Sequence, residues 1–153
     1  MAERYAVTGL QTAVEVSAGE AILNLFSPGT THRGEIYYMA FSAGGTMADQ
    51  VQTVQVQRTT AVGTEGAGVV PAPVESGVPA SILDGAEDHS VEPTYTAATE
   101  LWENDMHIRA LVQVQLQPDG HLVIPAVASN GIAARSFSAN YTGGARATFH
   151  FNE

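Results

Sequence analysis

The sequence predicts an all-β fold, an antiparallel sandwich or barrel formed by residues 1–153 as one domain. The β-branched residues Val, Ile and Thr number 36 against eight Leu, and they suit a pleated surface better than a helix. The 15 Gly and 7 Pro divide the chain into mostly short segments. Two of the segments alternate apolar and polar residues with a period of two, which is typical of half-buried strands.

The first half of the chain contains four predicted strands. Val14 and Val16 mark one of them, and residues 21–26 form the next. Residues 34–42 are apolar on both faces, so they form either a central strand of the core or a strand whose outer face lies under a neighbouring subunit. Residues 51–59 form the fourth strand.

A long irregular loop is expected in the middle of the domain. Gly and Pro recur throughout residues 61–85, which leaves little room for a long helix or strand. Residues 81–83 are the one place in this loop where we expect a short helical turn. The loop lies within the domain and does not link two domains.

The second half of the chain contains the clearest alternation, over residues 106–116, which predicts one strand with a core face and a polar face. Residues 117–120 read Gln-Pro-Asp-Gly and predict a tight turn, so residues 121–124 are the expected hairpin partner. Residues 145–152 predict the last strand. We expect these apolar side chains to share one core: Ile108, Val112, Val114, Phe149 and Phe151.

Charge and composition exclude several classes of partner. The chain carries 16 Asp and Glu against six cations, all arginine, for a net charge of −10. This leaves no basic patch for nucleic acid. The longest apolar run has six residues, far fewer than the ~20 of a membrane-spanning helix, and no signal-peptide core is evident. We expect no membrane partner and synthesis in the cytoplasm. Without cysteine, disulfides and thiolate chemistry are excluded.

No catalytic motif is present, and the five histidines are scattered singly, so we predict no enzyme, no metal and no cofactor. The best polar constellation is Glu103, Asp105, His107 and Arg109, which share one face at strand spacing. Such a face can hold a general base or a cation. It can equally be a solvated edge whose mixed charges discourage aggregation.

Acidic residues also cluster along the chain, since seven of the 16 fall between positions 84 and 105. We expect them to form a solvated face. They are Asp84, Glu87, Asp88, Glu92, Glu100, Glu103 and Asp105.

Several short segments together resemble one known family. They are residues 4–9, 93–96, 118–120, 123–126, 128–133, 138–143 and 147–151. The chain resembles the jelly-roll decoration (cement) proteins of tailed bacteriophage heads, most densely from residue 93 onward, while residues 60–89 depart most from the pattern. The resemblance implies a jelly-roll β-sandwich on the outer capsid surface of the virion, often a homotrimer, that stabilises the shell by bridging subunits of the major capsid protein.

Candidate contacts with the capsid or with a second subunit follow from side-chain chemistry. Arginine pairs bidentately with carboxylates and stacks on aromatic rings. The two tyrosines belong to the strand over residues 34–42 that is apolar on both faces, where an outward aromatic side chain could meet a second subunit. The candidates are Arg4, Arg33, Tyr37, Tyr38, Arg135 and Arg146.

Two other functions compete with this interpretation. The first is a carbohydrate- or receptor-binding jelly-roll module of a phage head or tail, in which Trp102 and Tyr95 form a stacking platform, although a single Trp is more often a core residue. The second is a cupin-like enzyme that uses the face of Glu103, Asp105 and His107.

Overall fold

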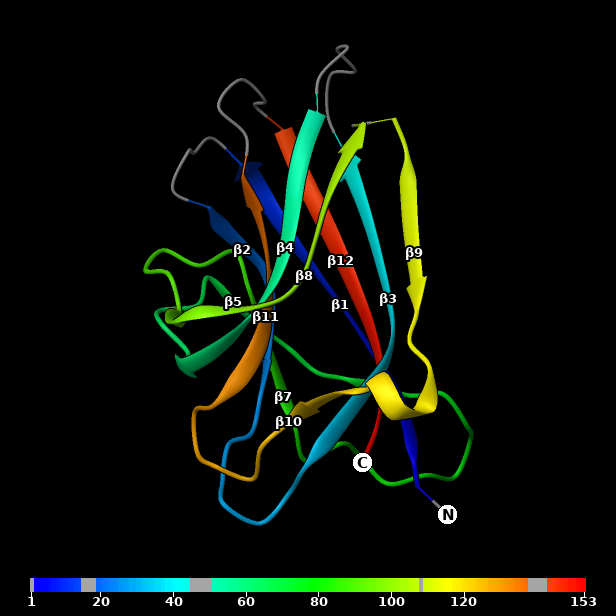
Figure 1. Cartoon of the computed structure of the whole chain (residues 1–153). Helices are drawn as coiled ribbons and strands as arrows, with labels where there is room; N and C mark the ends of the chain where they lie inside the picture. The colour runs from blue at the N-terminus through cyan, green and yellow to red at the C-terminus, as the bar shows by residue number, and fades with distance from the viewer. Residues whose placement is uncertain (1, 15–18, 45–50, 108, 138–142) are drawn as a thin grey trace.

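Nearly every element of the computed structural model is a β-strand (Figure 1). The structure describes residues 2–14, 19–44, 51–107, 109–137 and 143–153. The elements are β1 (Arg4–Val14), β2 (Glu20–Phe26), β3 (Gly34–Gly44), β4 (Val51–Ala61), β5 (Ala67–Val69), β6 (Ala72–Pro73), β7 (Asp84–Glu87), β8 (Thr94–His107), β9 (Leu111–Gln115), the 3-10 turn η1 (Pro118–Gly120), β10 (Leu122–Ile124), β11 (Gly131–Phe137) and β12 (Gly143–Asn152).

The strands form two antiparallel sheets that pack face to face. Sheet A has the order β10-β3-β12-β1-β6, with β9 also paired to β3, and sheet B has the order β5-β7-β2-β11-β4-β8. The strands pair in a nested order, from the two ends of the chain toward its middle. The pairs are β1·β12, β2·β11, β3·β9 and β4·β8. This winding, with four principal strands in each sheet, is that of a jelly roll. The predicted all-β, jelly-roll-like sandwich is therefore confirmed.

The core lies between the sheets. It contains the described apolar side chains that the period-two alternation predicts to face inward. Phe149 and Phe151 are fully buried, while Val112 and Val114 are partly buried and pack against the same cluster. Ile108 lies outside the described residues. The inner face of β3 supplies Ile36, Met39 and Phe41. The apolar residues of sheet B close the other side.

The prediction of one strand over residues 106–116 is wrong. Strand β8 ends at His107 and pairs with β4 of sheet B, whereas β9 begins at Leu111 and pairs with β3 of sheet A. The amide of Ala110 donates to the carbonyl of His107 (2.8 Å) where the chain turns between the sheets. The period of two continues across this crossing because both strands turn one face to the same core.

The tight turn at residues 117–120 is present as η1, but it does not join a hairpin. Strand β10 pairs with residues 34–36 of β3, and β9 pairs with residues 38–42 of the same strand. Both strands lie on the same side of β3. Residues 111–124 therefore form one edge of sheet A, and the chain leaves the sheet only around η1. The predicted pairing between residues 106–116 and 121–124 is therefore wrong.

The long Gly- and Pro-rich loop lies between β4 and β8 and closes one side of the sandwich. Its strands β5 and β7 extend sheet B beyond β2, and β6 lies beside β1 of sheet A. The helical turn expected at residues 81–83 is absent. The amide of Leu83 instead donates to Ser81 Oγ (3.1 Å) and to the carboxylate of Glu153 (2.9 Å), and the chain continues into β7.

Carboxylates of this loop cap the edges that it covers. Glu87 accepts a hydrogen bond from the Leu10 amide (2.5 Å), and Glu92 accepts one from the Ala21 amide (2.8 Å). Asp88 accepts one from Thr12 Oγ1 (2.9 Å). These three carboxylates accept hydrogen bonds from backbone and side-chain donors along β1 and β2. Those donors are therefore not available to pair with a strand of another chain.

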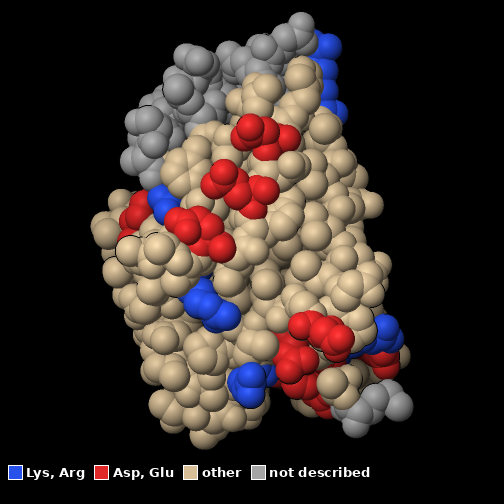
Figure 2. Space-filling model, in the orientation of Figure 1, with Lys and Arg blue, Asp and Glu red and all other residues tan. Residues whose placement is uncertain are grey.

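The predicted solvated acidic face is therefore only partly correct. Glu100, Glu103 and Asp105 are exposed along β8, where acidic side chains follow one another in the upper half of the view in Figure 2. Asp84 is exposed as well, but Glu87, Asp88 and Glu92 are half-buried where the loop packs against β1 and β2.

Candidate binding site on the outer face of sheet A

Four of the six predicted contact residues lie on the outer face of sheet A, but only Arg4, Tyr37 and Tyr38 line the hollows there, whereas Arg146 lies farther along β12. The register of the sheet places Arg4 of β1 opposite Asn152, and Arg146 of β12 opposite Ser42. Tyr37 and Tyr38 of β3 lie on the same face, where they line surface hollows together with residues of β9 and β12. Segments that are far apart in sequence therefore form one surface.

A β-bulge explains why residues 34–42 appear apolar on both faces. The register between β3 and β12 shifts between the pairs His150↔Tyr38 and Phe151↔Ile36, so Tyr37 has no opposing residue. Two consecutive tyrosines consequently stand on the outer face, while Ile36 and Met39 point into the core. One face of β3 therefore belongs to the core, and the other face forms part of the outer surface.

Two histidines join the tyrosines in a cluster of rings. Tyr38 lies 4.9 Å from His150 between ring centroids, with an interplanar angle of 55°. Tyr37 lies 6.1 Å from His150, nearly edge-on at 83°, and 6.2 Å from His121 at 48°. Because the four rings meet at these angles and are only half-buried, parts of their faces remain accessible.

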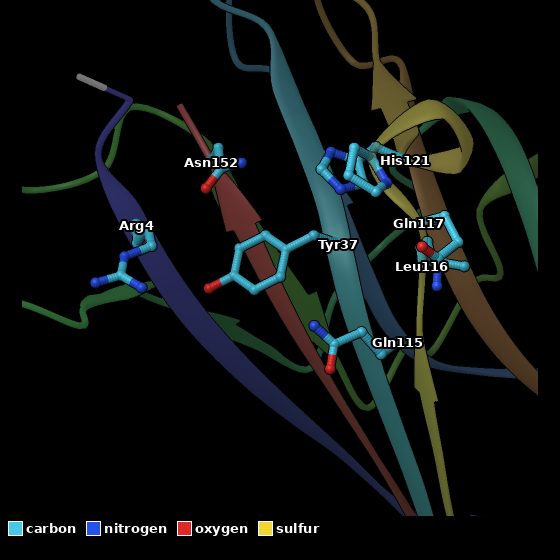
Figure 3. A pocket seen from close by; sticks show the side chains of 8 residues that line it. Arg4, Tyr37, Gln115, Leu116, Gln117, His121 and Asn152 are labelled. Carbon is cyan, nitrogen blue, oxygen red and sulfur yellow. The ribbon is translucent and has the colours of Figure 1, made fainter.

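Two adjoining hollows lie over this cluster. The larger, about 430 Å³, is lined by Tyr37, Tyr38, Ala40, Gln115, Thr148 and His150. The smaller, about 300 Å³, is lined by Arg4, Tyr37, Gln115, Leu116, Gln117, Pro118, His121 and Asn152. Tyr37 and Gln115 belong to both, and Figure 3 shows the ring of Tyr37 across the middle of the smaller hollow, with the amides of Gln115 and Asn152 on either side. We call the joined hollows the tyrosine groove.

The charges around the tyrosine groove are compensated. Arg4 Nε donates to Glu75 Oε1 (3.0 Å), and this contact raises the pKa of Arg4. His121 Nδ1 lies 3.7 Å from Glu35 Oε2. Partial burial lowers the pKa of His150, which favours its neutral form. The middle of the surface is therefore neutral, although the whole chain carries a net charge of −10.

The other two predicted contact residues lie elsewhere. Arg33 is exposed in the connection between β2 and β3. Arg135 is half-buried on sheet B, where its guanidinium lies over the rings of Tyr95 (3.8 Å) and Phe137 (4.6 Å). Its Nη1 also donates to Gln57 Oε1 (2.8 Å), so Arg135 makes its contacts within the chain.

The stacking platform of Trp102 and Tyr95, which belongs to the competing carbohydrate-binding hypothesis, is not formed. Trp102 stacks on the core residue Phe41, with ring centroids 5.1 Å apart and an interplanar angle of 13°. Tyr95 lies beneath Arg135 and donates its hydroxyl to Glu92 (3.1 Å). Burial raises the pKa of Tyr95 above its ordinary value. Among the described residues, Tyr37 and Tyr38 are instead the tyrosines that line surface hollows.

The polar constellation of the sequence is divided by the end of β8. Glu103 and Asp105 are exposed on the strand and accept hydrogen bonds from Gln55 (2.8 Å) and Thr53 (2.5 Å), respectively. Arg109 lies in the turn beyond the strand, so the four residues do not share one strand face. Among the described residues, no three His, Asp or Glu side chains are grouped closely enough to hold a metal.

Local sequence patterns indicated little of the rest of the groove. His150 could be placed on an outward face by its alternation, but Gln115, His121 and Asn152 come from segments whose pairing the sequence did not show. Within the described ranges, no helix is long and apolar enough to cross a bilayer. Comparison with protein-family models, with curated proteins and with solved structures gives no match.

Proposed function

We propose that this chain is a structural protein of the virion, which binds the outer surface of a phage capsid and stabilises it by bridging subunits of the major capsid protein. The strand order of the jelly roll carries the proposal, because it is the fold that the sequence resemblance implies. Such a protein acts by binding the assembled shell in preference to free subunits, so it shifts the equilibrium toward the assembled state.

Two arginines are the strongest candidates for the capsid contact. Arg33 and Arg146 are exposed, and in the part of the chain that the structure describes neither guanidinium forms a hydrogen bond or ion pair. Both can therefore pair with carboxylates of a partner without breaking a contact of their own. Arg4 and Arg135 would first have to leave Glu75 and Gln57.

A homotrimer would strengthen a weak single contact. Three linked copies raise the effective concentration of each remaining contact once the first has formed. A contact site that spans neighbouring capsid subunits would also distinguish an expanded shell from free subunits. The proposal therefore combines a small contact for each copy with tight attachment of the trimer.

The direct test is co-sedimentation of the purified protein with empty expanded shells and with free capsid subunits. We expect attachment to shells only, with weaker attachment as salt rises, because exposed ion pairs are screened. The double variant Arg33→Ala/Arg146→Ala should attach more weakly and show less salt dependence. Glu65→Gln, which changes an exposed charge on the central loop, is the matched control and should attach at least as well as the unchanged protein.

The functional readout is the temperature at which particles rupture. Particles that lack the protein should assemble but release their DNA at a lower temperature, and adding back the purified protein should restore the original value. Equal rupture temperatures with and without the protein, or no attachment to expanded shells, would remove the proposal.

A further inference from the structure

The tyrosine groove has the chemistry of a carbohydrate site, and we propose that it binds a neutral oligosaccharide. This second binding activity goes beyond attachment to a capsid and does not depend on it. The occupant is inferred from the shape, the rings, the amides and the charge of the groove.

The shape of the groove fits an elongated ligand of a few rings. Its two hollows, about 430 and 300 Å³, fall in the lower part of the range of ~300–1,000 Å³ that small-molecule sites occupy. Because Tyr37 and Gln115 line both hollows, a ligand that extends from one to the other passes these two side chains. Two neighbouring sugar units would occupy the two hollows in this way.

The rings of the groove offer surfaces for the apolar faces of sugars. Tyr38 and His150 line the larger hollow, and Tyr37 and His121 line the smaller one. Each hollow therefore contains a tyrosine next to an imidazole, and the angles between the rings prevent them from covering each other completely. Rings of this kind combine a large apolar area with a polar tip, which suits a ligand that has both C–H and O–H groups.

Three amide side chains supply hydrogen bonds beside the rings. Gln115, Gln117 and Asn152 line the groove, and within the described part of the chain none of their side chains forms a hydrogen bond. Each amide has two donor hydrogens and one acceptor oxygen. A pair of neighbouring sugar hydroxyls, each both donor and acceptor, matches this set. Thr148 adds a hydroxyl, which already pairs with Thr8 across the sheet (2.9 Å).

The charge of the groove favours a neutral ligand. Arg4, the one arginine among the described lining residues, is bound to Glu75, so an anionic sugar or a phosphate would have to compete with that ion pair. Among the described residues that line the groove there is no carboxylate, so these residues offer no site for a cation. A neutral oligosaccharide is the ligand class that uses the rings and the amides without leaving a buried charge.

The first experiment exposes the labelled full-length protein to an array of neutral, sialylated and sulfated glycans. We expect binding to one or more neutral oligosaccharides, and titration of the best of these should shift the NMR amide signals of β3, β9 and β12. No binding to any neutral glycan, or binding to anionic glycans alone, would overturn the proposal.

Paired variants then locate the site. Gln115 and Gln113 are exposed amides two residues apart on the outer side of β9, but only Gln115 lines the groove. We expect Gln115→Ala to weaken binding roughly tenfold and Gln113→Ala to leave it unchanged. Tyr38→Ala should weaken binding at least as much, whereas Tyr38→Phe, which keeps the ring, should retain most of the affinity. Equal effects of the two glutamine variants would place the ligand elsewhere and overturn the proposal.

These measurements use the free protein, so their outcome is independent of capsid attachment. Failure of glycan binding with normal attachment to shells would remove only the groove proposal. Failure of attachment with normal glycan binding would remove only the decoration proposal.

Discussion

At the scale of single residues, burial determines how the arginines and histidines act. The guanidinium of Arg135 contacts two aromatic rings and an amide of its own chain. Arg33, by contrast, is exposed, so its guanidinium is available to another molecule. His89 is only 7% exposed and lies just before the segment that leads into β8. The same residue type therefore stabilises the fold at one position and is available for binding at another.

Acidification should destabilise the fold through His89. Burial lowers the pKa of His89 below its ordinary value of 6.5, so the folded state binds fewer protons than the unfolded state. The stabilisation is complete above the unfolded pKa and is lost as the pH falls through and below that value. Urea unfolding at pH 7.5 and 5.5 should show a smaller loss of stability in His89→Gln than in the unchanged protein.

The comparison of the two proteins isolates His89, because it is the one side chain in which they differ. An equal loss of stability in the variant and in the unchanged protein would contradict the prediction.

At the scale of strands, close approach between sheets restricts side-chain size more than the alternation does. Gly9 of β1 is buried where β1 passes over β2. A Cβ atom built there would lie 2.6 Å from the carbonyl oxygen of Ile22 and 2.8 Å from Leu23 Cβ. One of the neighbours is backbone, so the strands themselves would have to separate.

Gly9→Ala should therefore destabilise the protein by about 1–3 kcal/mol, the usual cost of overpacking. Gly120→Ala is the control, because nothing lies within 4 Å of a Cβ at that position. The measurement is the free energy of unfolding in urea for both variants. Similar values for the two would show that β1 and β2 can separate without cost.

At the scale of the whole molecule, the jelly roll joins the two ends of the chain. The amide of Glu3 donates to the carbonyl of Glu153 (3.1 Å), and the amide of Glu153 donates to the carbonyl of Glu3 (2.9 Å). Figure 1 shows both ends at the same end of the sandwich. Strands β6 and β7 of the central loop lie beside β1 and β2. The pairing of segments that are distant in sequence therefore fixes the overall shape.

A circular permutant should consequently fold. Residues 3 and 153 would be joined by a short linker, and new ends would be opened between Asp119 and Gly120 in the exposed turn η1. We expect the β-rich circular dichroism spectrum and cooperative unfolding of the parent. A second permutant, opened between Ala147 and Thr148 inside β12, should not fold, because that strand pairs with both β1 and β3. Folding of neither permutant would contradict the prediction.

The sequence by itself determined the fold class, most strand positions and the inward residues of β12. Alternation with a period of two is a local property, so it identifies which residues of a strand face the core. It also allowed His150 to be placed outward. The excess of carboxylates and the lack of cysteine and lysine likewise follow from composition alone.

Only the tertiary structure decided which strands are neighbours and what the surface residues contact. The break between β8 and β9 was hidden because strands of both sheets point toward one core and keep the same period. The bulge at Tyr37 arises between the pairs His150↔Tyr38 and Phe151↔Ile36, whose members are more than 100 residues apart in sequence, and no local pattern reports it. The roles of Glu87 and Glu92 as caps depend on the same long-range pairing. So does the assembly of the tyrosine groove, whose lining comes from β1, β3, β9, β12 and the residues around η1. Register between distant strands is a property of the whole fold, because each pairing is fixed only when the core that both strands share has formed.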